Sequence, residues 1–239
     1  MEVGGKVAIV TGAGAGIGRA VATALAAEGA AVVVADVDHD EGRRTAEQLG
    51  GRFVHADVLV DDDLRALIAT AEGLEILVNN AGGAPGPYYP EAPIEHWSRT
   101  LDLNLRSTMV ATQLAVEAMP AGGAIVNVSS IAGYGLDPHD APEYAAAKAG
   151  IIRLTGALSP LAVTHGIRVS CICPDWVETP AVHRSLASMS EQERAQLPEL
   201  VSAEEIARLA LDLIRDETSA GRVVIRPAGG SAFTLPGAG

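Results

Sequence analysis

Cysteine and aromatic residues are scarce in this chain, which has two cysteines and 3% aromatics among 239 residues. Cys171 and Cys173 lie in one apolar run, and we expect two small buried residues on opposite faces of a strand, without a bond between them. With no disulfide framework, a reducing cytoplasm is the expected compartment. No apolar run reaches the roughly 18 residues of a membrane-spanning helix, and residues 1–6 lack the features of a signal peptide.

Basic residues are also few. Lys and Arg number 17 against 30 Asp and Glu, which gives a formal net charge of −13 and a pI near 4.8. A field of this sign repels nucleic-acid phosphates and anionic lipid, so we expect neither nucleic acid nor a membrane as a partner. Because hydrophobic residues make up 48% of the chain with almost no aromatics, the core must consist of Ala, Val, Ile and Leu. This composition suits helices packed closely on a parallel sheet.

Short β-branched runs alternate with longer helical patterns along the chain, which predicts parallel pairing with right-handed crossovers. We therefore predict an α/β fold, a Rossmann-type doubly wound parallel sheet of about seven strands with helices on both faces, in a single domain over residues 1–239. The expected strands are Lys6–Thr11, Ala31–Ala35, Arg52–Ala56, Leu74–Val78, Ala124–Val128, Ile167–Cys173 and Val223–Ile225. The expected helices are one that begins near Ile17, then Asp40–Leu49, Asp61–Ala71, Ile94–Met119, Glu143–His165 and Val201–Arg215.

Prolines and polar stretches mark the ends of this pattern. Pro120 is expected to stop the Ile94–Met119 helix, and Pro160 interrupts the following helix near its end. Residues 178–200 are polar and lack a strand pattern, so we interpret them as a candidate lid. Residues 231–239 are expected to be poorly ordered unless a neighbouring subunit holds them.

A glycine-rich turn joins the first expected strand to the first helix. Its spacing is G-x-x-x-G-x-G, and it does not fit G-x-G-x-x-G because residue 17 is Ile. Such a turn lets backbone N–H groups approach a pyrophosphate, and the helix N-terminus favours the negative charge. The alternative is a turn without a ligand. The residues that we expect at a dinucleotide diphosphate are Gly12, Gly14, Gly16, Ile17 and Gly18.

An acidic residue, Asp36, ends the second expected strand. A carboxylate there can accept hydrogen bonds from the adenosine ribose hydroxyls, and it repels a 2′-phosphate. Positions 13 and 15 are Ala, so the turn supplies no basic side chain for that phosphate. These residues favour NAD over NADP as the cofactor. Arg43 and Arg44 are the counter-evidence, and we interpret them as solvated helix residues.

A second acid, Asp57, ends the third expected strand and precedes Val58. An acid at this place can meet the amino group of an adenine ring. It can equally be a loop acid that leads into the next helix. Both interpretations stand on the sequence alone.

Tyr144 and Lys148 are four residues apart in an expected helix, so the phenol and the ammonium share a face. A free tyrosine has a pKa of about 10, and lowering this pKa by about three units requires roughly 4 kcal/mol. One ammonium about 4 Å away supplies about that energy at an effective dielectric constant near 20. We expect Lys148 to lower the pKa of Tyr144. The alternative is an amphipathic helix with an incidental Tyr and Lys.

Six motifs in one order resemble the short-chain dehydrogenase/reductase family, in its single-domain branch of about 250 residues. The resemblance covers residues 6 to about 230. The motifs are the glycine turn Thr11–Gly18, Asn79-Asn80-Ala81-Gly82, the helical Asn104, Asn127-Val128-Ser129-Ser130, the pair Tyr144 and Lys148, and the segment from Pro174 to Thr179.

The resemblance implies a catalytic role for four residues. Tyr144 would be the general base in oxidation and the general acid in reduction, and Lys148 would lower its pKa and bind the nicotinamide ribose. Ser130 would hold the substrate oxygen, and Ser129 is its rival for this role. Asn104 would kink its helix and fix a water for proton relay. The expected activity is hydride transfer between NAD and a secondary alcohol or ketone.

The resemblance also implies cofactor contacts outside the glycine turn. Asn79 would brace neighbouring strands. No metal is required, and the six histidines show no ligand spacing. Besides Tyr144 and Lys148, the implied cofactor residues are Asn80, Ala81, Gly82, Pro174, Val177 and Thr179.

Three features depart from the family pattern. Ser130 and Tyr144 are 14 residues apart where 13 is usual, and the longer loop carries His139. That histidine either contacts substrate or lies in a solvated loop. Asp175 stands where glycine is common, which puts the local turn in doubt. Arg226-Pro227-Ala228 replaces an apolar residue and Asp before Gly229-Gly230, which leaves the geometry of the tail open.

The substrate wall is expected to be partly apolar, with Tyr134, His139, Trp176 and Leu186 as candidate contacts. Family analogy implies a homotetramer in which the Ile94–Met119 and Glu143–His165 helices pack across an interface. Two other functions stay open on the sequence. The chain could be an NAD(H)-binding regulator or scaffold, or an NAD-using dehydratase or epimerase.

Overall fold

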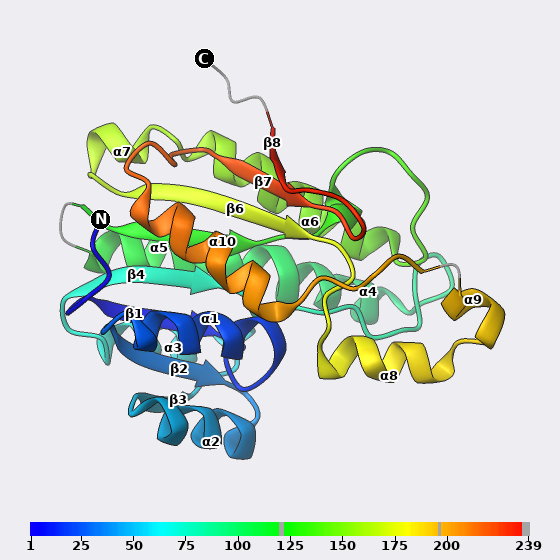
Figure 1. Cartoon of the computed structure of the whole chain (residues 1–239), viewed down its shortest axis with the longest axis horizontal. Helices are drawn as coiled ribbons and strands as arrows, with labels where there is room; N and C mark the ends of the chain where they lie inside the picture. Colours follow the sequence, from blue (N-terminus) through cyan, green and yellow to red (C-terminus); the bar gives the residue numbers. More distant parts are fainter. Residues whose placement is uncertain (120–121, 196, 236–239) are drawn as a thin grey trace.

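The computed structural model describes residues 1–119, 122–195 and 197–235, and an eight-stranded sheet runs through them (Figure 1). The strand order is β3-β2-β1-β4-β5-β6-β7-β8, with β1 through β7 paired in parallel and β8 antiparallel to β7. The predicted doubly wound α/β sheet is thereby confirmed. The strands are β1 (Val7–Thr11), β2 (Ala31–Asp36), β3 (Arg52–His55), β4 (Leu74–Asn79), β5 (Ala124–Val128), β6 (Arg168–Pro174), β7 (Val223–Arg226) and β8 (Phe233–Thr234).

Helices cover both faces of the sheet. In Figure 1, α1 and α10 lie in front of it, and α3, α5 and α6 lie behind it. Among the described residues no helix combines the length and apolarity needed to cross a membrane. The helices are α1 (Gly16–Ala27), α2 (His39–Leu49), α3 (Asp61–Ala69), α4 (Ile94–Leu101), α5 (Ser107–Ala118), α6 (Pro142–Ala157), α7 (Leu161–Thr164), α8 (Pro180–Ser188), α9 (Glu191–Ala195) and α10 (Ala203–Arg215).

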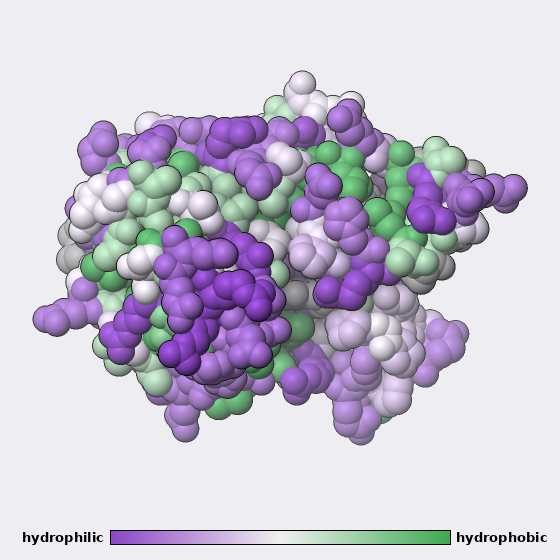
Figure 2. All heavy atoms as spheres, turned by 60° about the horizontal axis from the view of Figure 1, so that its bottom comes forward, coloured by the Kyte–Doolittle hydropathy of each residue, from purple (hydrophilic) through white to green (hydrophobic). Residues whose placement is uncertain are grey.

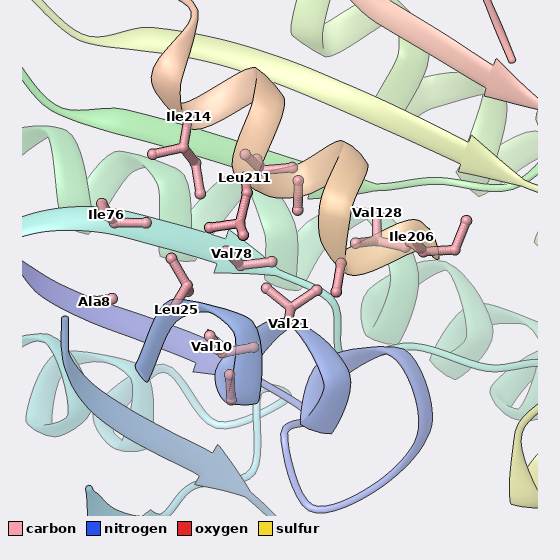
Figure 3. Packing of buried hydrophobic residues seen from close by; sticks show 14 of the residues in the cluster. Ala8, Val10, Val21, Leu25, Ile76, Val78, Val128, Ile206, Leu211 and Ile214 are labelled. Carbon is pink, nitrogen blue, oxygen red and sulfur yellow. The ribbon is translucent and has the colours of Figure 1, made fainter. Parts of the chain in front are cut away.

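The core consists of aliphatic side chains that alternate between the two faces of the central strands. Even-numbered positions such as Val10 and Val78 pack beneath α1 and α10, as Figure 3 shows. Odd-numbered neighbours such as Ile9 and Leu77 pack on the opposite face with residues of α3 and α5. Because both faces of each central strand are buried, the strands read as continuous apolar runs in the sequence.

Two helices expected as single rods are interrupted. The Ile94–Met119 segment contains a π-helical turn, η1 (Asp102–Arg106), between α4 and α5. The helix ends at Ala118, and Pro120 lies outside the described residues. The Glu143–His165 segment divides into α6 and α7 around a turn that includes Pro160.

The end of the chain contributes an eighth strand that we did not predict. Phe233 pairs with Ile225 in β7, so part of the segment expected to be poorly ordered joins the sheet. Residues 236–239 of that expectation lie outside the described residues.

The two cysteines are buried and free, as expected, but their predicted orientation is wrong. Their Sγ atoms lie 3.8 Å apart on one face of β6. Residues two apart in a strand point to the same face, so Cys171 and Cys173 both pack with Ile151 of α6 and Val223 of β7.

A chain of hydrogen bonds between buried amide and hydroxyl side chains joins β4 and β5 to the helices behind them. Asn79 at the end of β4 donates from Nδ2 to Asn127 Oδ1 of β5 at 2.9 Å and to Thr112 Oγ1 of α5 at 3.0 Å. Asn127 in turn donates to Thr155 Oγ1 of α6 at 3.1 Å. Because these groups are all buried, each depends on its partner for satisfaction.

Removing the middle member of this chain should destabilise the fold. Asn127→Ala leaves the Asn79 amide and the Thr155 hydroxyl short of a partner, and we expect a loss of about 2–3 kcal/mol in the free energy of unfolding, measured by urea denaturation. Gln113→Ala, on the exposed side of α5, is the control and should change that energy by less than about 0.5 kcal/mol. Equal stability of the two variants would contradict the structural role of the chain.

Candidate active site

A cleft of about 610 Å³ opens at the carboxyl ends of the central strands, where the strand order reverses between β1 and β4. Open parallel sheets bind ligands at this place. Figure 2 shows a hollow between the mostly hydrophilic lobe formed by α2 and the lobe formed by α8. The cleft wall combines the glycine turn, residues after β4 and β5, the start of α6 and the start of α8.

The glycine turn leaves its backbone open toward the cleft. Gly12 and Gly16 have φ angles of +63° and +53°, which side chains with a Cβ rarely adopt. A Cβ on Gly18 would lie 2.2 Å from Gly12 O, so only glycine lets α1 approach β1 this closely. The turn therefore fits the backbone cradle that a dinucleotide diphosphate requires.

Asp36 holds the glycine turn at one end of the cleft. Its Oδ2 accepts from the Gly14 amide at 2.6 Å, and its Oδ1 accepts from the Asp38 amide at 2.9 Å. A Cβ on Gly14 would lie 2.8 Å from that Oδ2, which explains the glycine. Asp38 and Glu41 line the cleft nearby, so this end is rich in carboxylates.

Basic residues at this end are neutralised. The Arg19 guanidinium donates to Gly14 O and Thr45 Oγ1 and forms an ion pair with Glu41. Arg43 and Arg44 are exposed on α2, where they pair with Glu47 and Glu41. Arg19 is a site residue that the sequence reasoning missed, although its position next to Gly18 was a signal.

Asp57 and Val58 do not line the cleft. The Asp57 carboxylate accepts from the Leu59 amide at 3.0 Å, and its own amide donates to Asp63 Oδ2 at 2.9 Å. These bonds shape the loop that leads into α3.

Asn80 and Ala81 fix the end of β4 against β1. Both amides donate to Thr11 Oγ1, at 3.0 and 3.1 Å, and Asn80 Nδ2 donates to Thr11 O and Gly12 O. Asn80 thereby fixes the backbone at the start of the glycine turn, at Thr11 and Gly12. Gly82 also lines the cleft.

Asn104 lies fully buried in the π-helical turn η1. Its Oδ1 accepts from the Gly83 amide at 3.0 Å, and its Nδ2 donates to Gly83 O at 2.7 Å and Thr100 O at 2.9 Å. A Cβ on Gly82 would lie 2.7 Å from Asn104 Oδ1 and 3.3 Å from Lys148 Nζ, so Gly82 separates these two side chains.

Tyr144 and Lys148 project from the first two turns of α6 into the same cleft. Lys148 is buried, and its Nζ donates to Val128 O at 3.0 Å and lies 5.4 Å from the Tyr144 ring centroid. Ser130 follows β5 and lines the cleft beside them. Ser129, the rival serine, instead donates from Oγ to Lys148 O at 2.7 Å and is buried.

Burial sets the ionisation of this group. It raises the pKa of the Tyr144 phenol above its ordinary value, while a hydrogen bond with Ser130 lowers it in part. It also lowers the pKa of Lys148 to about 8. The expectation that Lys148 lowers the pKa of Tyr144 is therefore wrong for the chain on its own. The Lys148 ammonium donates to Val128 O, and the main cause of the raised pKa of Tyr144 is the loss of hydration around its phenol.

Asp175 and Arg226, which depart from the family pattern, connect the end of β7 and the segment after it to the rest of the fold. Asp175 accepts through Oδ2 from the Ala228 amide at 3.1 Å, which joins the end of β6 to the segment after β7. Arg226 pairs with Glu205 of α10 at 2.5 Å. Val177, two residues after Asp175, is buried and forms an isolated parallel β-bridge with Val201.

The candidate substrate residues lie outside the cleft wall itself. His139 lies beside Tyr144, with their ring centroids 5.9 Å apart, and its Nδ1 accepts from the Ala141 amide at 3.0 Å. Tyr134 packs edge-on against Phe233 of β8. Trp176 follows β6 and Leu186 lies in α8, and both side chains are half-buried. The candidate lid, residues 178–200, contains the helices α8 and α9.

The sequence and the fold were compared with known proteins. Residues 12–223 match a family model described as enoyl-(acyl carrier protein) reductase. An uncharacterized oxidoreductase, YxbG, of Bacillus subtilis is 34% identical, with 97% of this chain and 93% of the relative covered. Trans-4-hydroxycyclohexanecarboxylate dehydrogenase of Sinomonas cyclohexanicum is 36% identical, with 91% and 89% covered.

A solved structure gives the same result. The structure of 7 alpha-hydroxysteroid dehydrogenase complexed with NADH and 7-oxo glycochenodeoxycholic acid has a TM-score of 0.85 and 31% sequence identity, with 96% of this chain and 95% of that chain covered. The family match, the relatives and the fold agree with the motifs at the cleft. This chain belongs to the short-chain dehydrogenase/reductase family.

Proposed function

We propose that this protein is an NAD-dependent oxidoreductase that interconverts a secondary alcohol and a ketone by hydride transfer, with Tyr144 as general acid and base. The observation that carries this proposal is the convergence of Ser130, Tyr144 and Lys148 in the cleft that the glycine turn also lines. The relative from Sinomonas supports the reaction class, because its name describes oxidation of a ring alcohol.

A nicotinamide dinucleotide fits the cleft, because the open glycine backbone faces it and a single wall connects that turn with Tyr144. Bound there, the nicotinamide ring supplies the hydride donor or acceptor. The wall residues that we assign to its binding are Gly12, Gly16, Ile17, Asn80, Ala81, Gly82, Tyr144, Lys148, Pro174, Val177 and Thr179. Gly14 and Gly18 set the shape of the turn, and we assign Asp36, whose carboxylate accepts from the Gly14 amide, to the ribose of adenosine. The assignments of Asp57 and Val58 to the cofactor remain predictions.

Carboxylates support NAD over NADP. Asp36, Asp38 and Glu41 gather at the end of the cleft where the ribose of adenosine would lie, and they repel an added phosphate. Arg19, which lines this end of the cleft, and Arg44 on α2 are both paired with Glu41. A 2′-phosphate would therefore find net negative charge.

Tyr144 moves the proton of the reaction. In ketone reduction its phenol donates a proton to the carbonyl oxygen, and in alcohol oxidation its phenolate removes the hydroxyl proton. Ser130 holds the same oxygen by a hydrogen bond, which stabilises the charge that develops on it. Because burial raises the pKa of Tyr144, the neutral phenol is the resting form near neutral pH.

Lys148 and Asn104 support the return of the proton to solvent. They flank Gly82, and the carboxamide oxygen of Asn104 and the Lys148 ammonium both point toward it. We assign to this pair the positioning of a water that passes protons toward Tyr144. The Asn104 bonds to Gly83 keep the π-helical turn in place for this purpose.

We assign the substrate to the class of small alcohols and ketones and place it at Tyr144 beside His139. Tyr134, Trp176 and Leu186 remain predicted substrate contacts. His139 Nδ1 accepts a backbone N–H, so the neutral ring carries its proton on Nε2. That N–H can donate to an oxygen on the substrate. A substrate with a second polar group near the alcohol would use it.

The remaining expectations from the sequence stay proposals. One catalytic unit comprises residues 1–239, the protein acts in the cytoplasm, and the α4–α5 rod and α6 pack across a homotetramer interface. An NAD(H)-binding scaffold and an NAD-using dehydratase or epimerase are the alternatives. Net formation of NADH during turnover separates both from the proposed reaction.

Tyr144→Phe removes the phenol oxygen while it keeps the ring. We expect turnover of secondary alcohols to fall by at least about 10³-fold, because the phenol oxygen is the group that exchanges a proton with the substrate oxygen. NADH should bind with unchanged affinity, measured by its fluorescence. Retained turnover in this variant would contradict the role of Tyr144.

Asp36→Asn keeps the shape of the side chain and removes its charge. We expect the unmodified protein to prefer NAD in kcat/KM, and the variant to narrow that preference about tenfold, because the repulsion of a 2′-phosphate weakens. Asp57→Asn is the control and should leave the preference as it is. Equal use of NADP by the unmodified protein would refute the argument from Asp36.

The raised pKa of Tyr144 predicts opposite pH profiles for the two directions. The phenol stays protonated at neutral pH, so ketone reduction should be level from about pH 6 to 8 and fall at higher pH. Alcohol oxidation needs the phenolate, so its kcat/KM should rise over the same range. Oxidation that slows as the pH rises from about 6 to 8 is the contrary result.

A further inference from the structure

The first turn of α8 faces the glycine turn across the cleft. Thr179 caps this helix by accepting from the Val182 amide at 3.2 Å. A Cβ on Gly16 would lie 3.0 Å from Thr179 Cγ2, so the helix begins in contact with the glycine turn. Figure 1 places α8 beyond the carboxyl ends of the central strands. Any group bound on the glycine turn therefore meets α8 on its other side.

Arg184 lies on the cleft side of this helix. Pro180, Ala181 and Arg184 all line the cleft, and residues three and four apart share a helix face. The Arg184 side chain thus extends from the face that looks toward the glycine turn, one helical turn beyond Ala181. The helix N-terminus adds partial positive charge at the same place.

Arg184 differs from the other cations of the cleft wall, because those already have partners. Arg19 is paired with Glu41, and Lys148 is buried with its ammonium on Val128 O. Within the described residues, the Arg184 guanidinium makes neither a hydrogen bond nor an ion pair. The exposed Arg184 guanidinium lines the cleft and is free to donate bidentate hydrogen bonds to an anion bound there.

We propose that Arg184 binds the diphosphate of the dinucleotide, opposite the glycine turn. This inference rests on the dinucleotide site of the proposed function and adds a binding residue to it. The diphosphate is the anion that lies on the glycine turn, where α8 begins. A 2′-phosphate would lie at the end that holds Asp38 and Glu41, and a substrate carboxylate would lie beyond Tyr144 and Ser130.

The test compares ligands with and without the diphosphate, in the absence of substrate. Dissociation constants of NADH, ADP-ribose and adenosine are measured by calorimetry for the unmodified protein, Arg184→Ala and Arg184→Lys. We expect Arg184→Ala to weaken NADH and ADP-ribose about tenfold, or about 1.4 kcal/mol, and to leave adenosine unchanged. Arg184→Lys should recover part of the loss, because it restores the charge without the planar fork.

Arg194→Ala on α9 is the matched control, since Arg194 is exposed on the same polar segment and does not line the cleft. It should bind all three ligands as the unmodified protein does. Unchanged NADH affinity in Arg184→Ala, or an equal loss for adenosine, would overturn the inference. The inference would also be overturned if Arg184→Ala bound NADH normally and only its KM for substrates with a carboxylate increased, because Arg184 would then bind the substrate. Because binding is measured without turnover, the assignment of Tyr144 can fail while this result stands, and the reverse also holds.

Discussion

The arrangement of the cleft depends on a reciprocal pair of hydrogen bonds between β5 and α6. The Lys148 ammonium donates to Val128 O, and the Ser129 hydroxyl donates to Lys148 O. These bonds fix the helix that carries Tyr144 against the strand that leads to Ser130, and the buried amide chain through Asn127 extends the same connection to β4. They also require a buried ammonium, whose pKa falls to about 8 because it loses hydration. Burial of the ammonium costs stability, and it fixes a positive charge 5.4 Å from the centroid of the Tyr144 ring.

Charge is distributed along the cleft in a way that matches its chemistry. Carboxylates gather at the Asp36 end, where the proposed function places the ribose of adenosine with free hydroxyls. The glycine turn and Arg184 line the same cleft, and Thr179 at the start of α8 touches Gly16. Lys148 supplies positive charge at the Tyr144 end. A net charge of −13 repels anions at long range, so binding of a dinucleotide has to come from these local groups.

Local pattern was enough to predict the parallel sheet, the glycine turn and the shared face of Tyr144 and Lys148, because each depends on residues close in sequence. The shared face of the two cysteines depends on the same kind of local rule, because residues two apart in a strand point to one face. The remaining features depend on distant partners. The π-helical turn at Asn104 is held by Gly83, and the tail is fixed by Asp175 on Ala228. The raised pKa of Tyr144 comes from tertiary burial, which the spacing of two residues does not encode.

The proposed function requires Tyr144 to exchange its proton, although burial raises its pKa. An oxidised nicotinamide ring bound beside Tyr144 would add positive charge to that of Lys148, and we propose that the two charges together lower this pKa. Ionisation of Tyr144 can be followed directly by nuclear magnetic resonance of ¹³C-labelled tyrosine, with Tyr144→Phe to assign the signal. The account predicts a pKa above the ordinary value of about 10 in the free protein and a clear decrease when NAD is bound. A pKa that is already depressed in the free protein, or one that NAD leaves unchanged, would contradict it.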